Sequence, residues 1–189
     1  MELIEIIKVV ILGIIQGITE WLPISSTGHM LLANTFLNLK QDKAFMDMFV
    51  VVIQLGSILA VVALYFNKLN PFSRAKSRAE RFATFQLWFK VLVAVLPVGV
   101  IGLLVDDWVT DHFYTPTVIA IALIFYGVLF ILLERRNRTV RPRIRSFEQL
   151  SYRTAFCIGM VQLLAIIPGT SRSGATILGA MLLGLSRSA

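Results

Sequence analysis

A carboxylate, an imidazole and several hydroxyl groups lie within ten residues of one another near the start of the chain. Glu20 ends an apolar stretch, and His29 follows directly after the run Ser-Ser-Thr-Gly at 25–28. Gln16 precedes Glu20 by one helical turn and shares its helix face. A carboxylate in apolar surroundings can bind a divalent cation, position a water or exchange a proton; a structural ion pair is the alternative. His29 is equally suited to catalysis and to a hydrogen-bonded helix cap.

A second polar run near the other end of the chain has a similar composition. Residues 170–174 read Thr-Ser-Arg-Ser-Gly and precede an apolar stretch, as residues 25–28 do. Unpaired N–H groups and the positive end of the helix dipole favour an anion at such a helix start. The forked guanidinium of Arg172 suits phosphate oxygens, although an Arg paired within the protein is the alternative. Together the two runs indicate a site for a phosphorylated group.

The elements that carry these runs are predicted to lie in a membrane. Hydrophobic residues make up 57% of the chain and charged residues 15%, whereas soluble domains have about 25% charged residues. This composition excludes a soluble globule and predicts an all-α polytopic membrane protein. Three apolar segments are long enough to cross a bilayer. They are residues 48–67, 82–105 and 113–133, within a unit of three transmembrane helices over 45–134.

The basic residues are concentrated in two blocks that set the predicted orientation. Twelve of the 18 Lys and Arg lie at 67–84 and 135–153, each beside an apolar span, and no nucleic-acid-binding motif accompanies them. We therefore expect no nucleic-acid partner. The connector 106–112 contains three Asp and no Lys or Arg. The positive-inside rule places both basic blocks in the cytoplasm and this connector outside.

Two further apolar regions are broken by polar turns. The first runs over 3–22 and 29–39, and the second over 154–167 and 175–185. An 11-residue second half reaches about half the hydrocarbon thickness. Each region is therefore predicted to form a re-entrant hairpin, at 1–39 and at 154–186, because broken backbone at membrane depth needs protein or a polar cavity around it.

The two hairpins repeat one pattern at a constant offset of 146 residues. The pairs are Gly13 with Gly159, Gln16 with Gln162, Ser25 with Ser171, Thr27 with Ser173 and Gly28 with Gly174. Because three spans separate the copies, the second must enter from the opposite face, which predicts an inverted-topology repeat whose turns meet near the midplane. The rest of the second repeat would occupy about residue 191 to about 280. We therefore expect a truncated chain with low activity, unless a missing segment or the partner of a homodimer covers the second hairpin.

The sequences of both turns resemble a known enzyme family. The runs GIIQGITEWLPISSTGH at 13–29 and PGTSRSGAT at 168–176 closely resemble the undecaprenyl-diphosphate phosphatases of the bacitracin-resistance type. The resemblance implies a multi-pass enzyme of the bacterial plasma membrane, with its site facing outside. It also implies hydrolysis of the membrane lipid undecaprenyl diphosphate to undecaprenyl phosphate, recycling the carrier for peptidoglycan synthesis, and a divalent cation, Mg²⁺ or Ca²⁺.

Roles follow from the resemblance, position by position. Glu20 would hold the cation or orient the attacking water, with Gln16, which is Glu in many family members, as a second candidate ligand. His29 would be the nucleophile or the general acid/base, and Ser26 a phosphate ligand or the alternative nucleophile. Arg172 would clamp the diphosphate. The substrate-binding candidates from both turns are Ser25, Thr27, Gly28, Thr170, Ser171, Ser173 and Gly174.

Two questions stay open at the level of sequence. Covalent attack and direct attack by water are both compatible with these residues. A lipid-phosphate flippase or secondary transporter is the alternative function, because inverted repeats with broken helices are also the plan of carriers. Carriers need no nucleophile or water-positioning group, so His29 and Glu20 favour hydrolysis.

Overall fold

The computed structural model describes residues 3–138 and 140–186, except the side chain of Lys43. These residues form helices, and no strand occurs among them. The α-helices are α1 Leu3–Thr19, α2 Ser26–Leu37, α3 Lys43–Leu64, α4 Phe66–Leu69, α5 Arg78–Phe113, α6 Pro116–Asn137, α7 Tyr152–Gln162 and α8 Arg172–Leu182. Two 3₁₀ turns are η1 Phe147–Gln149 and η2 Leu163–Ile166. The predicted all-α class is confirmed for this part of the chain.

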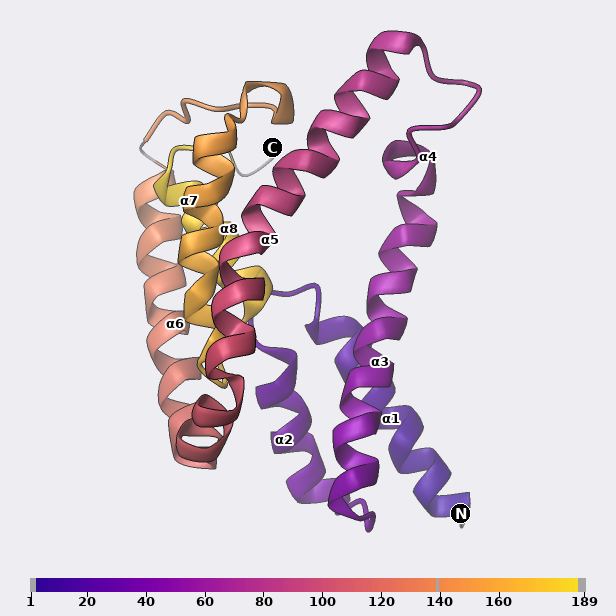
Figure 1. Ribbon diagram of the computed structural model, residues 1–189. Coiled ribbons are helices and arrows are strands. Elements are labelled where there is room, and N and C mark those ends of the chain that lie inside the picture. The colour runs from indigo at the N-terminus through magenta and orange to yellow at the C-terminus, as the bar shows by residue number, and fades with distance from the viewer. Residues whose placement is uncertain (1–2, 139, 187–189) are drawn as a thin grey trace.

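Helices α3, α5 and α6 are long and apolar enough to cross a membrane. They match the three predicted spans, and many of their large apolar side chains are exposed, as lipid-facing residues would be. The three helices run in alternating directions (Figure 1), so the basic blocks 67–84 and 135–153 lie at one end of the molecule. The acidic segment 106–112 lies at the other end, where α5 meets α6.

The acidic segment is helical, which corrects the predicted break between the second and third spans. Helix α5 continues for 36 residues through Asp106 and His112 to Phe113. Charged side chains do not interrupt a helix whose backbone hydrogen bonds remain satisfied, so this segment extends α5 beyond its apolar part. The chain reverses only at Tyr114 and Thr115, where Thr115 caps α6 and Pro116 occupies its first turn.

Two helical hairpins, α1–α2 and α7–α8, hold the polar turns. Ser25 caps α2 by accepting a hydrogen bond from the Gly28 N–H, and Ser171 caps α8 by accepting one from the Gly174 N–H. The caps are 146 residues apart and have the same form. Both second helices begin three residues earlier than the sequence indicated. The residues from Ser26 and from Arg172 onward therefore lie in a first helical turn.

Each hairpin packs against one long helix through its own apolar cluster. Leu12 and Leu39 of the first hairpin region are buried with Phe49 of α3. Ile158 and Leu185, at the positions 146 residues later, are buried in the second cluster against Val93 and Ala94 of α5. In Figure 1, α1 and α2 open toward the end where α5 meets α6, while α7 and α8 open toward the opposite end. The tips of the two hairpins, which carry the polar runs at 25–28 and 170–174, face each other in the middle.

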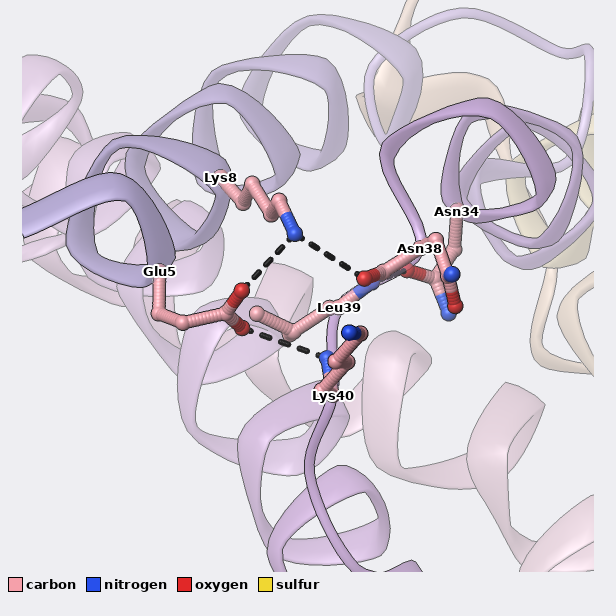
Figure 2. Close-up of polar contacts among 6 residues, drawn as sticks. All are labelled: Glu5, Lys8, Asn34, Asn38, Leu39 and Lys40. Carbon is pink, nitrogen blue, oxygen red and sulfur yellow. Dashed lines mark hydrogen bonds and ion pairs between the residues drawn. The ribbon is translucent and has the colours of Figure 1, made fainter. Parts of the chain in front are cut away.

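Polar contacts fix the open end of the first hairpin (Figure 2). Lys8 donates to Glu5 Oε1 at 2.7 Å and to the Asn38 carbonyl at 3.0 Å. The N–H of Lys40 donates to Glu5 Oε2 at 3.2 Å. Asn38 adopts the left-handed conformation that ends α2, with φ of 49°, which Asn tolerates better than most residues. These contacts join α1 to the segment after α2 and hold the open end of the hairpin together.

Candidate functional site

Both hairpin tips border a cavity of about 190 Å³. Helices α3 and α5 complete its wall. The polar lining residues are Glu20, Ser25, Ser26 and Thr27 from the first tip, Gln54 from α3, Asp106, Thr110 and Tyr114 from the end of α5, and Thr170, Ser171, Arg172 and Ser173 from the second tip. Most of the residues singled out from the sequence are therefore brought together in one place, although they come from positions up to 153 residues apart.

The carboxylate of Glu20 is held by three side chains. Its Oε2 accepts hydrogen bonds from Ser26 Oγ at 2.6 Å and from the amide of Gln16 at 2.7 Å, and its Oε1 accepts one from Gln54 at 3.3 Å. Because the Ser26 hydroxyl donates to a carboxylate, Glu20 is positioned to take up that proton. Within the described residues no ion pair joins Glu20 to Arg172, which leaves the structural ion pair unsupported.

The two tips also contact each other directly. Ser173 Oγ donates to the backbone carbonyls of Glu20 and Leu22, both at 3.4 Å. A methyl group at Gly174 would lie 3.4 Å from the Pro23 carbonyl oxygen, so the second tip approaches the first backbone to backbone. These contacts fix the position of Arg172 relative to Glu20.

Helix α6 supports both tips from one side. Gly169 has φ of +89° and packs so closely on Ile119 that a Cβ atom would lie 2.8 Å from its Cα. Gly28 lies equally close to the side chain of Leu123. Ile119 and Leu123 are the fourth and eighth residues of α6, which places the tips about 5–10 Å from its start. The site is therefore nearer the acidic end of the molecule than the basic end.

The second tip offers groups for an anion. Thr170 is 7% exposed, and its Oγ1 has no hydrogen-bond partner. Arg172 is exposed and lines the cavity, and its guanidinium has no hydrogen bond or ion pair within the described part of the chain. The first amides of α2 and α8 lack helical acceptors as at every helix start. A buried hydroxyl without a partner is costly, and a phosphate oxygen would supply the acceptor.

His29 lies beside the cavity rather than in its wall. Its Nδ1 is 2.9 Å from the Ser25 carbonyl oxygen. Because a carbonyl only accepts, Nδ1 must carry a proton, and in the neutral ring Nε2 is the nitrogen left to accept one. Ser25, not His29, caps α2. The catalytic role of His29 stays a prediction.

The described residues contain no group of three or more His, Cys, Asp or Glu that could hold a metal ion alone. Mg²⁺ sites that bind phosphates often use only one or two carboxylates and take the remaining ligands from substrate and water. Glu20 and Asp106 line the same cavity and fit that donor set. Gln16 directs its amide N–H toward Glu20, which orients this carboxylate.

Several lining residues were not identified from the sequence. Gln54 is a lone amide in an apolar span, and this isolation was a usable signal. Asp106, Thr110 and Tyr114 reach the site only because α5 continues past its apolar part. Partial burial, and secondly the Asp47 carboxylate, raise the pKa of Tyr114 above its usual value. Its phenol therefore stays protonated and can donate a hydrogen bond into the cavity.

Comparison with known proteins assigns the chain to a family. The family model described as bacitracin resistance protein BacA matches residues 9–189. The chain is 56% identical over 186 residues to an undecaprenyl-diphosphatase of Streptococcus thermophilus and covers 65% of that protein. It is 58% identical to the undecaprenyl-diphosphatase of Limosilactobacillus fermentum and 56% identical to undecaprenyl-diphosphatase 1 of Clostridioides difficile, covering 67% of each. These alignments include 98% of the chain, which spans about two thirds of the length of these relatives.

Proposed function

The chain belongs to the BacA family of bacitracin resistance proteins, and we propose that it hydrolyses undecaprenyl diphosphate to undecaprenyl phosphate and inorganic phosphate. The names of its relatives indicate the substrate. The observation that carries the proposal is the hydrogen bond of 2.6 Å from Ser26 to Glu20, in a cavity shared with Arg172. The reaction would return the lipid carrier to peptidoglycan synthesis in the bacterial cell membrane and confer bacitracin resistance.

Ser26 is the proposed nucleophile. Its Oγ attacks the terminal phosphorus while its proton passes to Glu20, the bond to the bridging oxygen breaks, and undecaprenyl phosphate leaves. Water then hydrolyses the phosphoserine to inorganic phosphate. Ser26 is favoured over His29 because Ser26 lines the cavity and is paired with a base. His29, one helical turn from Ser26, is assigned to proton transfer through its free Nε2.

The second tip is proposed to bind the phosphates. Arg172 provides a fixed positive charge and a bidentate fork for the oxygens of the transferred phosphoryl group. Thr170 Oγ1 donates a hydrogen bond to the substrate in place of the partner that it lacks. The first-turn amides of α2 and α8, which lack helical acceptors, would donate to the phosphates as well. Ser25, Thr27, Gly28, Ser171, Ser173 and Gly174 shape these helix starts.

Glu20, with Asp106 as the second carboxylate of the cavity, would hold the divalent cation. Bound there, Mg²⁺ or Ca²⁺ would neutralise the charge that develops on the phosphate oxygens. Gln16 and Gln54 would orient Glu20 through their amide groups. One or two carboxylates, with the remaining ligands supplied by substrate and water, would be a usual donor set for Mg²⁺ that binds phosphates.

The hairpins are proposed to be the two re-entrant elements of an inverted-topology repeat. Equivalent caps at Ser25 and Ser171 and equivalent buried residues at Leu12 and Ile158 support this interpretation. The cavity is expected to open toward the outside, because its wall includes the acidic end of α5, opposite both basic blocks. Homodimer formation stays a prediction.

Phosphate release from undecaprenyl diphosphate by detergent-solubilised protein tests the proposal. A flippase would release no phosphate, because it moves the lipid without breaking its phosphoanhydride bond. We expect release that depends on a divalent cation and is lost in Ser26→Ala and Glu20→Gln, with folding judged by size-exclusion profile. Labelled terminal phosphate should be trapped on the wild type by acid quench and not on Ser26→Ala. Full turnover by Ser26→Ala would exclude Ser26 as the nucleophile.

A further inference from the structure

A second cavity of about 220 Å³ lies at the opposite end of α5 from the candidate active site. Its wall is formed by α4, the loop before α5, the first turns of α5 and η1. Three lysines, Lys68, Lys76 and Lys90, line this lysine cavity. Lys90 and Asp106 are 16 residues apart on the same helix, about 24 Å along its axis. The lysine cavity is therefore separate from the proposed catalytic site.

Lys90 is the most informative of the three lysines. Its residue is 6% exposed, and its ammonium donates to the Phe147 carbonyl at 2.8 Å. No carboxylate lies within ion-pair distance of it in the described part of the chain. A lysine ammonium has three N–H donors, and a buried charge is costly unless it is paired. With one acceptor in the described part of the chain, this ammonium keeps two N–H donors that can bind an anion in the cavity.

The other two lysines extend the positive surface. Lys76 donates to the Lys68 carbonyl at 2.7 Å and to Thr84 Oγ1 at 2.9 Å, which fixes its ammonium at the cavity wall. The Lys68 ammonium lies 5.7 Å from the centre of the Phe147 ring. The three lysines thus belong to three segments, α4, the loop before α5, and α5 itself, while Ala83, Leu87 and Phe147 provide an apolar border.

Two carboxylates also line the lysine cavity, but both have local partners. Glu80 Oε2 accepts a hydrogen bond from the Ser77 N–H at 2.7 Å in the capping box of α5. The Ser146 side chain hydrogen-bonds to Glu148 and lowers the pKa of that carboxyl, with smaller effects from its own backbone and from Lys90 and Lys68. Three lysines against two carboxylates leave the cavity with a net positive charge.

We propose that the lysine cavity binds a phosphate group, either the headgroup of an anionic membrane lipid or free phosphate. Phosphate accepts several charge-assisted hydrogen bonds at once, which matches three ammonium groups around one space. Basic pockets between membrane helices on the cytoplasmic side are suited to lipid headgroups. The lysine cavity lies at the end of the molecule that carries both basic blocks, and its apolar border would accept the start of a lipid tail.

Binding to delipidated protein in detergent tests the proposal with three probes. They are short-chain phosphatidylglycerol, diacylglycerol, which has similar tails without the phosphate, and inorganic phosphate. Native mass spectrometry counts bound lipid, and thermal unfolding reports stabilisation by each probe. We expect phosphatidylglycerol or phosphate to bind and raise Tm, and diacylglycerol to do neither. If inorganic phosphate displaces phosphatidylglycerol, the cavity recognises the phosphate group alone. If it does not, the cavity recognises the lipid headgroup.

Variants localise the effect. Lys90→Met keeps the length of the side chain without its charge, and Lys76→Gln alters a less buried wall residue, so it serves if the first variant fails to fold. Each should weaken binding at least about tenfold, as expected for loss of a hydrogen bond between charged groups. Arg81→Gln is the matched control, because Arg81 is on α5 but does not line the cavity. Equal binding by all variants, or no binding of either phosphate-bearing probe by the wild type, would overturn the proposal.

Discussion

The guanidinium of Arg172 is the principal fixed charge in the wall formed by the second tip. The tip contacts that hold its backbone involve Ser173 and Gly174 rather than Arg172 itself, so its side chain is free to bind. We expect Arg172→Lys to fold normally and to lose at least about 10²-fold in kcat, because a point charge does not reproduce a bidentate fork. Steady-state phosphate release with a size-exclusion control measures this. Near-normal turnover would remove Arg172 from the phosphate clamp.

Gln54 is expected to act through Glu20 rather than on the substrate. Gln54 lies on α3, and its amide donates a hydrogen bond to Glu20 Oε1 over 3.3 Å. We expect Gln54→Leu to lower kcat about tenfold with little change in KM, because one of three groups that hold the carboxylate is lost. Ser57→Ala is the matched control: Ser57 is buried one turn later on α3 and bonds only to the Ile53 carbonyl. Equal losses in the two variants would indicate a general effect on α3.

The residue types in the sequence predicted the main chemical groups of the site, but they did not predict all the residues that line it. Glu20, Ser26 and Arg172 stood out because they lie at or within the polar turns that break two apolar regions, and the structure places all three on one cavity. Asp106 could not be assigned in this way, because its neighbours suggested a solvent-exposed connector. Only the path of α5 brings it to the site. The pairing of Ser26 with Glu20 likewise depends on the turn conformation at Ser25, whose φ of 63° is unusual for a residue with a side chain.

At the scale of elements, the closest packing joins α7 to α5. A Cβ atom on Gly159 would overlap the Ala94 carbonyl oxygen, whereas one on Gly13, its counterpart in the first hairpin, would meet nothing within 4 Å. We expect Gly159→Ala to destabilise the protein by about 1–3 kcal/mol or more, because two backbones would be forced apart. Gly13→Ala should be neutral or slightly stabilising, since Ala favours helix. Thermal unfolding in detergent compares them, and equal Tm values would contradict this packing.

Apolar runs and the polar breaks between them predicted the helices well, whereas charge was a poor guide to where the helices end. The caps at Ser25 and Ser171 and the proline-marked start of α6 have local causes that are readable in sequence. The continuation of α5 to Phe113 was missed because the three Asp residues suggested a loop. In a helix that extends past the bilayer, such residues are solvated and need no turn. The Thr115–Pro116 pair was the better boundary signal.

At the scale of the whole molecule, the two ends differ sharply in charge. The end formed by 67–84 and 135–153 carries 12 of the 18 Lys and Arg, while the segment 106–112 at the other end carries three Asp and none. Helices α3, α5 and α6 alternate between these ends. Since the proposed active site and the lysine cavity lie at opposite ends of α5, one orientation determines which side of the membrane each would face.

Cysteine labelling of intact cells tests that orientation. In a variant with Cys157→Ser, we expect a membrane-impermeant maleimide to modify Thr110→Cys and to spare Ala75→Cys, because the lysine- and arginine-rich end stays in the cytoplasm. Both positions are exposed, so burial cannot explain a difference between them. Permeabilised cells provide the control in which both should react. If Ala75→Cys were labelled and Thr110→Cys spared in intact cells, the proposed site would face the cytoplasm, and the lysine cavity would meet the outer leaflet instead.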